Sequence, residues 1–531
     1  MFKNKKTCLV LIFVIFIPLF IIKSLVNMVQ IPFHDYDEAH RVEGARNMRL
    51  NNYYTSPLAG TPYNSINEHS QSYTLDETIK ITPETSRPPL VFSLMAFFSG
   101  VLGDHEWAYR LPSFLLGLSA FFALLLFIKK YSADQFNYIA LTAAFLALLT
   151  SYDWWHSAQM AHLDTGVSLF TGLALFLLIL FIKRQKKYYL IAAGASLGLG
   201  ILSKGPPAII FIAPLPYLLI RKKIKIKELV LLFIVAFITI LPWYIPLSLE
   251  HGWNYFFAKQ IGGYVSSPTS TKIGGGDLTQ AAPIFWYLRW WFDTFRPGIF
   301  LFGAFLLWDL IKKKLSWVKL TLLFYIIGGF GLFSYAKSKV WWYVLPVIPA
   351  VCAYLYFSVK DYLTENKKGM INLSLAILLS SLPILIWQTN TITLGYGLSI
   401  TVIIFVLLNC KLKIWGSKIE GLLLFSVFTS LFIFFLRFPT IIPPNPQVKA
   451  IGQYFQTLPA KKCLWVEEDF PYEAILYYSR VGRINYLDEE AKLSPDCQNY
   501  LIGKEDHPNF ETVFEKNGVS LYKINYKVPL E

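Results

Sequence analysis

Residues 88–103 read PPLVFSLMAFFSGVLG, and the membrane topology of the whole chain depends on this apolar stretch. It has 16 residues, opens with two prolines and ends in a glycine, whereas a helix needs about 20 residues to cross the hydrocarbon core. As a full crossing, it would put every later basic loop on the side that the positive-inside rule disfavours. We therefore predict that residues 88–103 form a re-entrant helix, which enters the bilayer without crossing it.

Basic clusters between the apolar runs favour this interpretation. If residues 88–103 do not cross, six clusters face the cytoplasm together with the N-terminus. These clusters are Lys129–Lys130, Lys183–Lys187, Arg221–Lys223, Lys312–Lys314, Lys367–Lys368, and Lys411 with Lys413. The apolar runs are residues 8–28, 111–128, 136–151, 165–182, 188–203, 206–220, 229–248, 297–311, 317–335, 341–359, 370–388, 391–409 and 420–437. The sequence thus predicts about thirteen transmembrane helices, with the C-terminus outside.

Composition supports a membrane protein and argues against nucleic-acid binding. Of the 531 residues, 54% are hydrophobic and only 16% are charged, against about 25% charged in soluble proteins. The net charge of +15 is spread over short loops between apolar runs. A nucleic-acid-binding protein would instead concentrate its basic residues on one soluble face. The lipid bilayer is the partner that this pattern indicates.

The chain divides into three parts. Residues 1–437 form the predicted transmembrane domain, in which residues 31–110 are a first external loop that contains the re-entrant helix. Residues 438–446, FPTIIPPNP, form a rigid linker. Residues 447–531 are predicted to be a small soluble α/β domain outside the membrane. Its predicted helices are 448–456 and 472–480, and its predicted strands are 463–466, 484–487, 500–502 and 520–524. Whether Cys463 and Cys497 pair within it is left open.

Three carboxylates follow the first apolar run in FHDYDEAHR, residues 33–41. Asp35, Asp37 and Glu38 repel one another at the outer edge of the membrane, and such crowding raises carboxyl pKa values or recruits a cation. The pattern is typical of a general base or a metal site, so Asp37 and Glu38 are candidate catalytic residues. The alternative is structural: one acid caps a helix over residues 38–50, and Glu38 pairs with Arg41 on its surface.

Further polar residues are expected on the same side of the membrane. Asp164 begins a predicted span, where its alternative role is that of a helix cap. Arg87, Lys204 and Lys339 are the basic complement, since a phosphate group at the bilayer surface needs cations to offset its charge. Each lysine alone is also explained by snorkelling to the interface. Together with the external acids, these residues indicate a site for an anionic lipid.

Several short motifs occur in a specific order over about residues 30–350. They are Asp37-Glu38, Arg87-Pro88-Pro89-Leu90, Arg110-Leu111-Pro112-Ser113, Leu163-Asp164, Leu202-Ser203-Lys204-Gly205-Pro206, Pro242-Trp243-Tyr244, and Lys339 with Tyr343-Val344-Leu345-Pro346. In this order they resemble the lipid-dependent glycosyltransferases of the GT-C fold. The resemblance is strongest to bacterial lipid A aminoarabinose transferases and to their relatives in the protein O-mannosyltransferase superfamily.

The resemblance implies a GT-C fold and transfer of a sugar, with inversion, from a polyprenyl-phosphate donor. The acceptor would be a lipid A-like glycolipid or another envelope glycan on the periplasmic side of the bacterial inner membrane. Asp37 would accept the acceptor's proton or stabilise positive charge at the anomeric carbon, with Glu38 beside it. The resemblance also implies that Arg87, Lys204 and Lys339 bind the donor phosphate. Asp35, Asp164 and Tyr343 would bind the sugar or the acceptor.

The chain also departs from the family pattern. Arg87 stands where a lysine is usual, Ser86 where many relatives carry glutamate, and Gln280 to Pro283 where many carry a histidine. The latter two positions bind metal in the family, so a divalent cation stays open. Two alternatives are a protein O-mannosyltransferase-like enzyme with a polypeptide acceptor, and a polyprenyl-lipid flippase or transporter. The sequence has no internal repeat of the kind many transporters show, which favours an enzyme.

Overall fold

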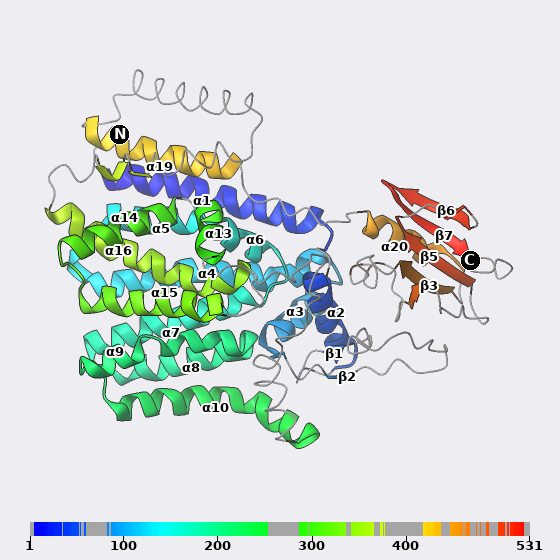
Figure 1. Ribbon diagram of the computed structural model, residues 1–531, viewed down its shortest axis with the longest axis horizontal. Helices are drawn as coiled ribbons and strands as arrows, with labels where there is room; N and C mark the ends of the chain where they lie inside the picture. The colour runs from blue at the N-terminus through cyan, green and yellow to red at the C-terminus, as the bar shows by residue number, and fades with distance from the viewer. Residues whose placement is uncertain are drawn as a thin grey trace.

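The computed structural model describes most of the helical part and most strands of the C-terminal domain. The described residues are 5–33, 36–52, 54, 58–59, 82–83, 87–252, 286–295, 297–335, 341–365, 372–374, 376–377, 418–436, 447–459, 462–467, 474, 478, 485–487, 498–504, 507–508 and 510–524. Figure 1 shows long helices lying side by side and a small sheet beyond one end of them.

Apolar runs form helices because a helix satisfies its own backbone hydrogen bonds where water is absent. The α-helices of this part are α1 (Lys5–Gln30), α2 (Tyr36–Leu50), α3 (Leu90–Leu102), α4 (Glu106–Ser132), α5 (Tyr138–Leu149), α6 (Tyr152–Gln159), α7 (Asp164–Arg184), α8 (Lys187–Lys204), α9 (Leu215–Ile220), α10 (Ile226–His251), α13 (Trp286–Thr294), α14 (Gly298–Ile311), α15 (Trp317–Tyr335), α16 (Ile348–Glu365) and α19 (Lys418–Leu436). Short 3-10 helices are η1 (Ala133–Gln135), η2 (Pro206–Ile212) and η4 (Trp341–Val347), and a two-stranded ribbon pairs β1 (Leu58–Ala59) with β2 (Thr82–Pro83).

Five helical segments within the described residues are long and apolar enough to cross a membrane. They are Glu106–Ser132, Asp164–Arg184, Ile226–Leu249, Trp317–Ser334 and Trp342–Glu365. Shorter apolar helices accompany them, including α3, α5 and α14. The chain is therefore a multi-pass membrane protein. Of the predicted spans, 391–409 lies outside the described residues and 370–388 lies mostly outside them, so the total of about thirteen stays a prediction.

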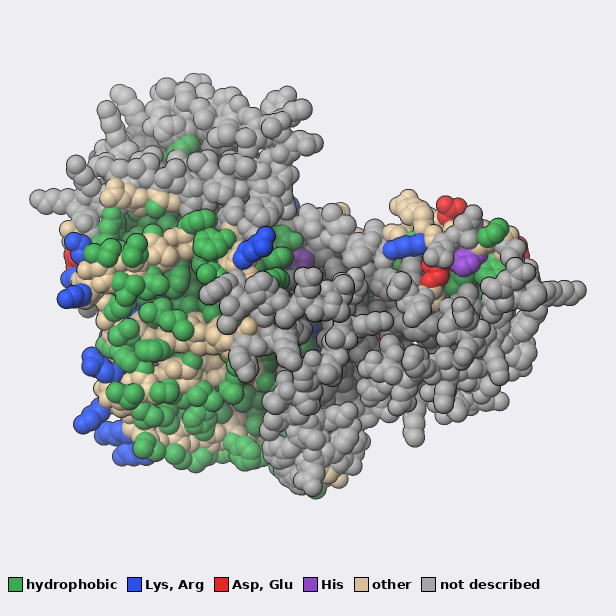
Figure 2. All heavy atoms as spheres, in the orientation of Figure 1, with side chains coloured by type: hydrophobic (Ala, Val, Ile, Leu, Met, Phe, Trp, Pro, Cys, Tyr) green, Lys and Arg blue, Asp and Glu red, His purple; other side chains and the backbone are tan. Residues whose placement is uncertain are grey.

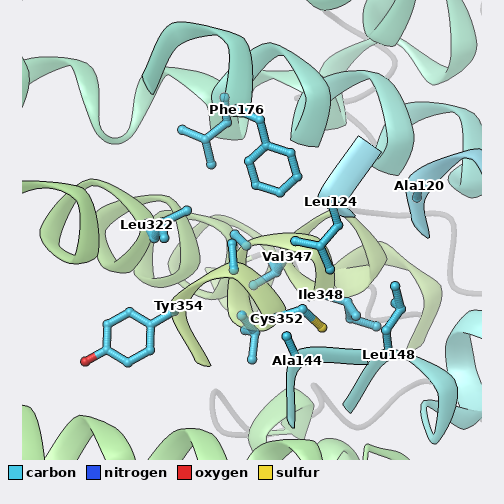
Figure 3. Close-up of a cluster of buried hydrophobic side chains, with 14 of the residues drawn as sticks. Ala120, Leu124, Ala144, Leu148, Phe176, Leu322, Val347, Ile348, Cys352 and Tyr354 are labelled. Carbon is cyan, nitrogen blue, oxygen red and sulfur yellow. The ribbon is translucent and has the colours of Figure 1, made fainter. Parts of the chain in front are cut away.

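The centre of the helical part is formed by α7 and α16, whose most apolar windows are 83% and 89% buried. Figure 3 shows side chains from α4, α5, α7, α15 and α16 gathered around one point. Phe176 of α7 also stacks on Phe127 of α4 with ring centroids 4.3 Å apart. The hydroxyl of Tyr354 points out of this apolar cluster and donates to Asp309 at 2.7 Å. The core is thus apolar, with its polar groups at the margin.

Helix α10 lies at the outside of the helical part, since only 28% of its most apolar window is buried. It packs closely on α8, because Gly194 and Gly198 leave room for its backbone. A Cβ at Gly198 would lie 2.8 Å from the carbonyl oxygen of Ala236, and one at Gly194 would lie 2.5 Å from that of Leu232. Small residues at such spacing are typical of helix interfaces in membranes. The exposed large side chains in its middle, from Val230 to Ile245, are apolar, as a lipid-facing helix requires.

The two ends of the helical part differ in charge. Lysines and arginines of four loops, Lys129–Lys130, Lys183–Lys187, Arg221–Lys223 and Lys312–Lys314, lie at helix ends that we call the basic end. Figure 2 shows lysine and arginine side chains along this edge of the molecule, next to an apolar surface. The chain's N-terminal end lies there too, while the C-terminal sheet lies at the other end, which we call the distal end (Figure 1).

The re-entrant prediction concerns α3, which begins directly after Pro88 and Pro89. With 13 residues it is about 20 Å long, which is less than the roughly 30 Å of a hydrocarbon core. It packs against α2 and α4 at the distal end. That it enters the membrane without crossing it stays a prediction.

Three features of the helical part differ from the prediction. The predicted span 206–220 is broken into η2 and α9, because proline lacks the backbone N–H that a continuous helix needs, and prolines 206, 207, 214 and 216 lie within it. The predicted span 341–359 begins as η4 and becomes α-helical only at Ile348. The short helices α6 and α13 were not predicted, since neither is long or apolar enough to stand out as a span.

The C-terminal domain is a five-stranded sheet with α20 (Val448–Thr457) packed on it. Its strands are β3 (Lys462–Glu467), β4 (Asn485–Leu487), β5 (Gln498–Gly503), β6 (Glu511–Lys516) and β7 (Val519–Ile524), in the order β4-β3-β5-β7-β6. β3 pairs in parallel with β4 and β5, whereas β7 pairs antiparallel with β5 and β6. The edge strand β6 was not predicted, because its charged sequence ETVFEK lacks a buried face. Cys463 is disulfide-bonded.

Candidate active site

Asp164 and Lys204 form a buried ion pair at the distal end. Asp164 is the first residue of α7, and Lys204 is the last residue of α8. Because α7 and α8 are antiparallel neighbours, the start of one meets the end of the other. The Lys204 ammonium donates to Asp164 Oδ1, and the two residues are 7% and 1% exposed. The pair therefore holds the end of α8 against the start of α7.

Two glycines allow this close approach. Gly205 follows Lys204 with φ of +84°, a backbone conformation that glycine adopts without the strain other residues incur. Its N–H donates to the carbonyl oxygen of Ile201 at 2.7 Å, which ends α8. Across the helix pair, a Cβ at Gly166 would lie 2.9 Å from both Ser203 Oγ and a methyl carbon of Val91. The turn at residues 202–206, LSKGP, therefore fixes the position of the Lys204 backbone.

His162 lies on the other side of the Asp164 carboxylate. Its Nδ1 is 3.2 Å from Asp164 Oδ2. The backbone around it is held by Ser113 of α4: the N–H of His162 donates to Ser113 Oγ at 2.9 Å, and that hydroxyl donates to the His162 carbonyl at 2.9 Å. A histidine and a lysine thus contact different oxygens of one buried carboxylate.

Aromatic rings from η4 complete this side of the site. The Lys204 ammonium lies 4.4 Å from the ring centroid of Tyr343, within the range of a cation–π contact. The Trp342 ring packs edge-on against His162, with centroids 4.8 Å apart. The guanidinium of Arg41 in α2 is 6.0 Å from the Trp342 ring, and its charge acts on Asp164. The site therefore combines one acid, three nitrogen bases and two aromatic rings, and we call it the Asp164 cluster.

Glu38 lies nearby but in a different environment. Arg110 Nε and Nη2 donate to its two carboxylate oxygens at 2.7 and 2.9 Å, and the N–H of Ala161 donates to Oε1 at 2.9 Å. The side chains of Glu38 and Arg110 are 0% and 1% exposed. The surface pair between Glu38 and Arg41, offered above as the structural alternative, is therefore wrong. A carboxylate bound on both oxygens by the protein is suited to holding structure.

Arg110 also organises the end of α1. Its Nη1 donates to the carbonyls of Met28 and Ile31 at 3.0 and 2.6 Å, and its Nη2 donates to that of Pro32 at 2.8 Å. The last carbonyls of a helix have no partners within the helix, and here the guanidinium supplies them. The Arg110–Glu38 pair thus sets the direction in which the chain passes from α1 into α2, which carries Asp37.

The structure brings together three of the predicted site residues, Asp164, Lys204 and Tyr343. Arg87 is partly buried just before α3, at the same end of the molecule. Asp37 is the second residue of α2, but its side chain lies outside the described residues. Asp35 and Lys339 also lie outside them. Arg41, His162 and Trp342 were not predicted as site residues, although His162 lies only two residues before Asp164.

No group of three or more His, Cys, Asp or Glu side chains that could hold a metal occurs among the residues described here. In the Asp164 cluster the acid is opposed by Lys204 and Arg41. Two cations beside one carboxylate make a poor environment for a third. The Asp164 cluster therefore does not fit a divalent cation.

The C-terminal domain contacts the α1–α2 junction through Tyr478. The N–H of Phe33 donates to the Tyr478 hydroxyl at 2.8 Å, and that hydroxyl donates to Glu106 of α4 at 3.2 Å. Lys449 of α20 also pairs with Glu106. Burial raises the pKa of Tyr478 well above its usual value, and the charge of Glu106 acts in the same direction. The hydroxyl therefore stays protonated and able to donate.

A further buried acid lies at the distal end, in the short helix α6. Asp153 accepts from Trp290 Nε1 at 3.0 Å and from the Thr294 hydroxyl at 2.8 Å. Both donors belong to α13, so this carboxyl fastens α13 to α6. Burial raises the pKa of Asp153 to about 7, although the two hydrogen bonds oppose the shift.

Known proteins share part of this sequence and the whole fold. Residues 86–245, which include Arg87, Arg110, Asp164 and Lys204, match the family described as dolichyl-phosphate-mannose-protein mannosyltransferase. The whole structure is similar to the crystal structure of ArnT from Cupriavidus metallidurans bound to undecaprenyl phosphate, with a TM-score of 0.69 and 16% identity. That match covers 97% of this chain and 98% of the other. The chain has the GT-C fold.

Two curated relatives match a smaller share of this chain. An uncharacterized protein of Aquifex aeolicus (strain VF5) is 24% identical over 65% of this chain and 66% of its own length. The undecaprenyl phosphate-alpha-4-amino-4-deoxy-L-arabinose arabinosyl transferase of Wigglesworthia glossinidia brevipalpis is 23% identical over 64% of this chain and 58% of its own. The chain thus spans less than two thirds of the length of these curated relatives.

Proposed function

We propose that this chain is a glycosyltransferase that moves a sugar from a polyprenyl-phosphate donor to an acceptor at the distal end of the membrane domain. The observation that carries the proposal is the Asp164 cluster: a buried acid and base, with further cations and aromatic rings, at one end of a GT-C fold. The cations suit a phosphate, and the rings and carboxylate suit a sugar. The family match and the likeness to ArnT support this assignment.

In this proposal the donor phosphate lies near Arg87 and Lys204, with Lys339 as a further cation. Asp164 holds the Lys204 ammonium in position beside the proposed phosphate. Asp164, Tyr343 and Asp35 are the candidate contacts for the sugar or the acceptor. Negative charge grows on the leaving phosphate as the glycosidic bond breaks, and a cation placed beforehand stabilises that change.

Asp37 is the proposed general base. It would take the proton of the acceptor hydroxyl as that oxygen attacks the anomeric carbon. Glu38, the next residue, is assigned a positioning role in place of the catalytic role predicted for it, because Arg110 and Ala161 occupy its oxygens. The pair would keep the start of α2, and therefore Asp37, in a fixed place.

The proposed acceptor is a lipid A-like glycolipid or another envelope glycan, because the named curated relative acts with an undecaprenyl-phosphate aminoarabinose donor. A protein acceptor is the second candidate, and the description of the matching family favours it. A lipid flippase is a third and weaker candidate, since the ionisable residues of the site lie at one membrane edge rather than at mid-membrane.

The proposed location is the bacterial inner membrane, with the site and residues 447–531 on the periplasmic side. Basic loops favour the cytoplasmic side, and they lie at the end opposite the sheet (Figure 1). The disulfide at Cys463 supports an oxidising compartment for the C-terminal domain.

The proposal is tested with purified full-length protein in nanodiscs, an undecaprenyl-phosphate-linked sugar, and extracted envelope glycolipids or a peptide as acceptor. The wild-type protein should form glycosylated product, and Asp37→Asn should abolish turnover without loss of folded protein. Glu43→Gln, a carboxyl change on the same helix at a residue that pairs with Arg46, should leave turnover near the wild-type rate. Near-wild-type turnover by Asp37→Asn would refute the role of Asp37. Movement of the lipid across the bilayer without sugar transfer would instead support a flippase.

A further inference from the structure

A cavity of about 440 Å³ opens at the basic end, far from the Asp164 cluster. It is lined by Tyr131, Ile182, Lys183, Gln185, Lys222, Lys223 and Trp317. Its size lies within the roughly 300–1,000 Å³ of small-molecule sites. These residues come from the ends of α4 and α7, the turn between α9 and α10, and the start of α15. The cavity is therefore built where four parts of the helical bundle leave the membrane region.

Aromatic side chains position two of its ammonium groups. The Lys183 ammonium donates to the carbonyl oxygen of Tyr131 and lies 4.0 Å from the centroid of its ring. The Lys223 ammonium lies 5.6 Å from the ring of Trp317. A cation near a ring face is stabilised by the electrons of that face. Two of the three lysines thus lie against aromatic rings of the cavity wall, although all three residues are exposed.

The backbone turns that carry the other lining residues are well defined. Gln185 has φ of +56° and ends α7, with its N–H bonded to the Phe181 carbonyl at 2.7 Å. Lys222 has φ of +51° in the turn after α9, with its N–H bonded to the Leu219 carbonyl at 2.9 Å. These left-handed residues close two helices. They hold Lys222 and Lys223 next to the end of α7.

The cavity carries net positive charge. The C-termini of α4, α7 and α9 adjoin it, and at about half a negative charge each they offset only part of the charge of the three lysines. Its lining residues include no aspartate or glutamate. Tryptophan and tyrosine beside lysine are typical of the membrane interface, where lipid head groups lie. Figure 2 shows basic side chains on this edge directly beside apolar surface.

We propose that this cavity binds the phosphate of an anionic phospholipid head group from the leaflet at the basic end. Lys183, Lys222 and Lys223 would contact the phosphate oxygens, and Trp317 and Tyr131 would flank the glycerol region. Basic pockets between transmembrane helices on the cytoplasmic side are suited to such head groups. The site is separate from the proposed donor-phosphate site and does not depend on the proposed function.

Native mass spectrometry of the full-length protein in detergent tests the proposal, with phosphatidylglycerol, phosphatidylcholine and inorganic phosphate as probes. The wild-type protein should retain phosphatidylglycerol in preference to phosphatidylcholine. Lys222→Gln combined with Lys223→Gln should weaken phosphatidylglycerol binding by about tenfold or more, since charged hydrogen bonds are lost. Lys222→Arg with Lys223→Arg should keep it. The matched control is Lys312→Gln with Lys313→Gln, which removes two exposed charges at the same end but outside the cavity.

Equal losses in the glutamine pair and in its control would overturn the proposal, because the effect would then be one of general charge. Equal retention of phosphatidylcholine and phosphatidylglycerol by the wild-type protein would overturn it too. Inorganic phosphate that displaces the lipid at equal concentration would identify a soluble anion as the ligand and overturn the lipid source. Each variant is compared at equal amounts of monodisperse protein, so a folding defect is visible as a loss of that peak.

Discussion

The hydroxyl of Tyr478 accepts a hydrogen bond from the backbone N–H of Phe33 at 2.8 Å, although 445 residues separate them in the sequence. The Tyr478 and Phe33 rings also stack, with centroids 6.0 Å apart. Phe33 in turn lies under the Arg110 guanidinium, which is 5.1 Å from its ring. The C-terminal domain therefore contacts the segment that leads into α2 and Asp37.

Tyr478→Phe should loosen this junction while leaving both domains folded. The buried N–H of Phe33 loses its acceptor, which costs about 1–3 kcal/mol. Hydrogen exchange of the peptide that contains Phe33 should become faster, and turnover should fall. Tyr454→Phe is the control, since the ring of Tyr454 stacks on Phe514 inside the C-terminal domain. Unchanged exchange in Tyr478→Phe would show that the hydroxyl does not hold the junction.

Breaking the Asp164–Lys204 pair from one side should be worse than removing both charges. Asp164→Asn or Lys204→Met each leaves a buried charge without its main partner, at a cost of about 3–5 kcal/mol. The double variant should unfold at a higher temperature than the single variants, yet it should remain inactive. Thermal unfolding and turnover, measured on all three proteins, check this. Additive losses of stability would contradict a direct pair.

Arg87→Ala should weaken donor binding more than Arg87→Lys does. A charged hydrogen bond to the donor phosphate contributes about 1.5–3 kcal/mol, so affinity should fall roughly tenfold to more than a hundredfold. Lysine keeps the charge but cannot make the bidentate hydrogen bonds of arginine, so the donor affinity of Arg87→Lys should be intermediate. Arg46→Ala, which removes an arginine paired with Glu43 and Asp104, is the control. An unchanged donor affinity per folded Arg87→Ala molecule would remove Arg87 from the site.

Asp153 should make the folded protein less stable as pH rises, whereas a salt-bridged acid makes it more stable. Its folded pKa of about 7 lies above the ordinary value of 3.8. The folded state therefore holds the proton more tightly, and stability falls as pH rises between roughly pH 4 and pH 7. Asp153→Asn mimics the protonated form, so its unfolding temperature should vary less between pH 5 and pH 8. A slope equal to that of the wild-type protein would contradict the assignment.

The topology gives a prediction that needs no substrate. Reporter fusions after residue 524 should be active only outside the cytoplasm, and fusions at Gln185 only inside. This follows because the basic loops and the C-terminal sheet lie at opposite ends of the helical part (Figure 1). A cytoplasmic C-terminus would contradict both the predicted thirteen-helix arrangement and the proposed location of the site.

Much of the fold could be predicted because it depends on local hydrophobicity. Long apolar runs such as 165–182 and 229–248 became α7 and α10 with ends shifted by a few residues. The predicted GT-C fold and the small C-terminal α/β domain are confirmed by the likeness to ArnT and by the sheet. The breaks within 206–220 and at η4 were not predicted, because they depend on how proline-containing turns pack in three dimensions. The edge strand β6 was not predicted, because it lacks the buried face that gives a strand its alternating apolar pattern.

The site was predictable where a residue's position next to a helix end revealed it. Asp164 and Lys204 stood out as charges at the ends of apolar runs, and they lie together as α7 and α8 require. Arg41 and His162 carried no such signal, because their role depends on partners from α7 and η4. The partner of Glu38 was not predictable for the same reason: Arg110 lies 72 positions away, so pairing within the helix looked equally reasonable.

The bond between Phe33 and Tyr478 also sets an order of events during biogenesis. Synthesis proceeds at about 5–20 residues per second, so the 445 positions from Phe33 to Tyr478 take roughly 20–90 s to make. Through that interval α1 and α2 have already been made, but the amide of Phe33 still lacks its final acceptor. The segment that leads to Asp37 is therefore completed only after the last domain has been exported and folded. A chain truncated before Tyr478 would keep its helices and never finish that junction.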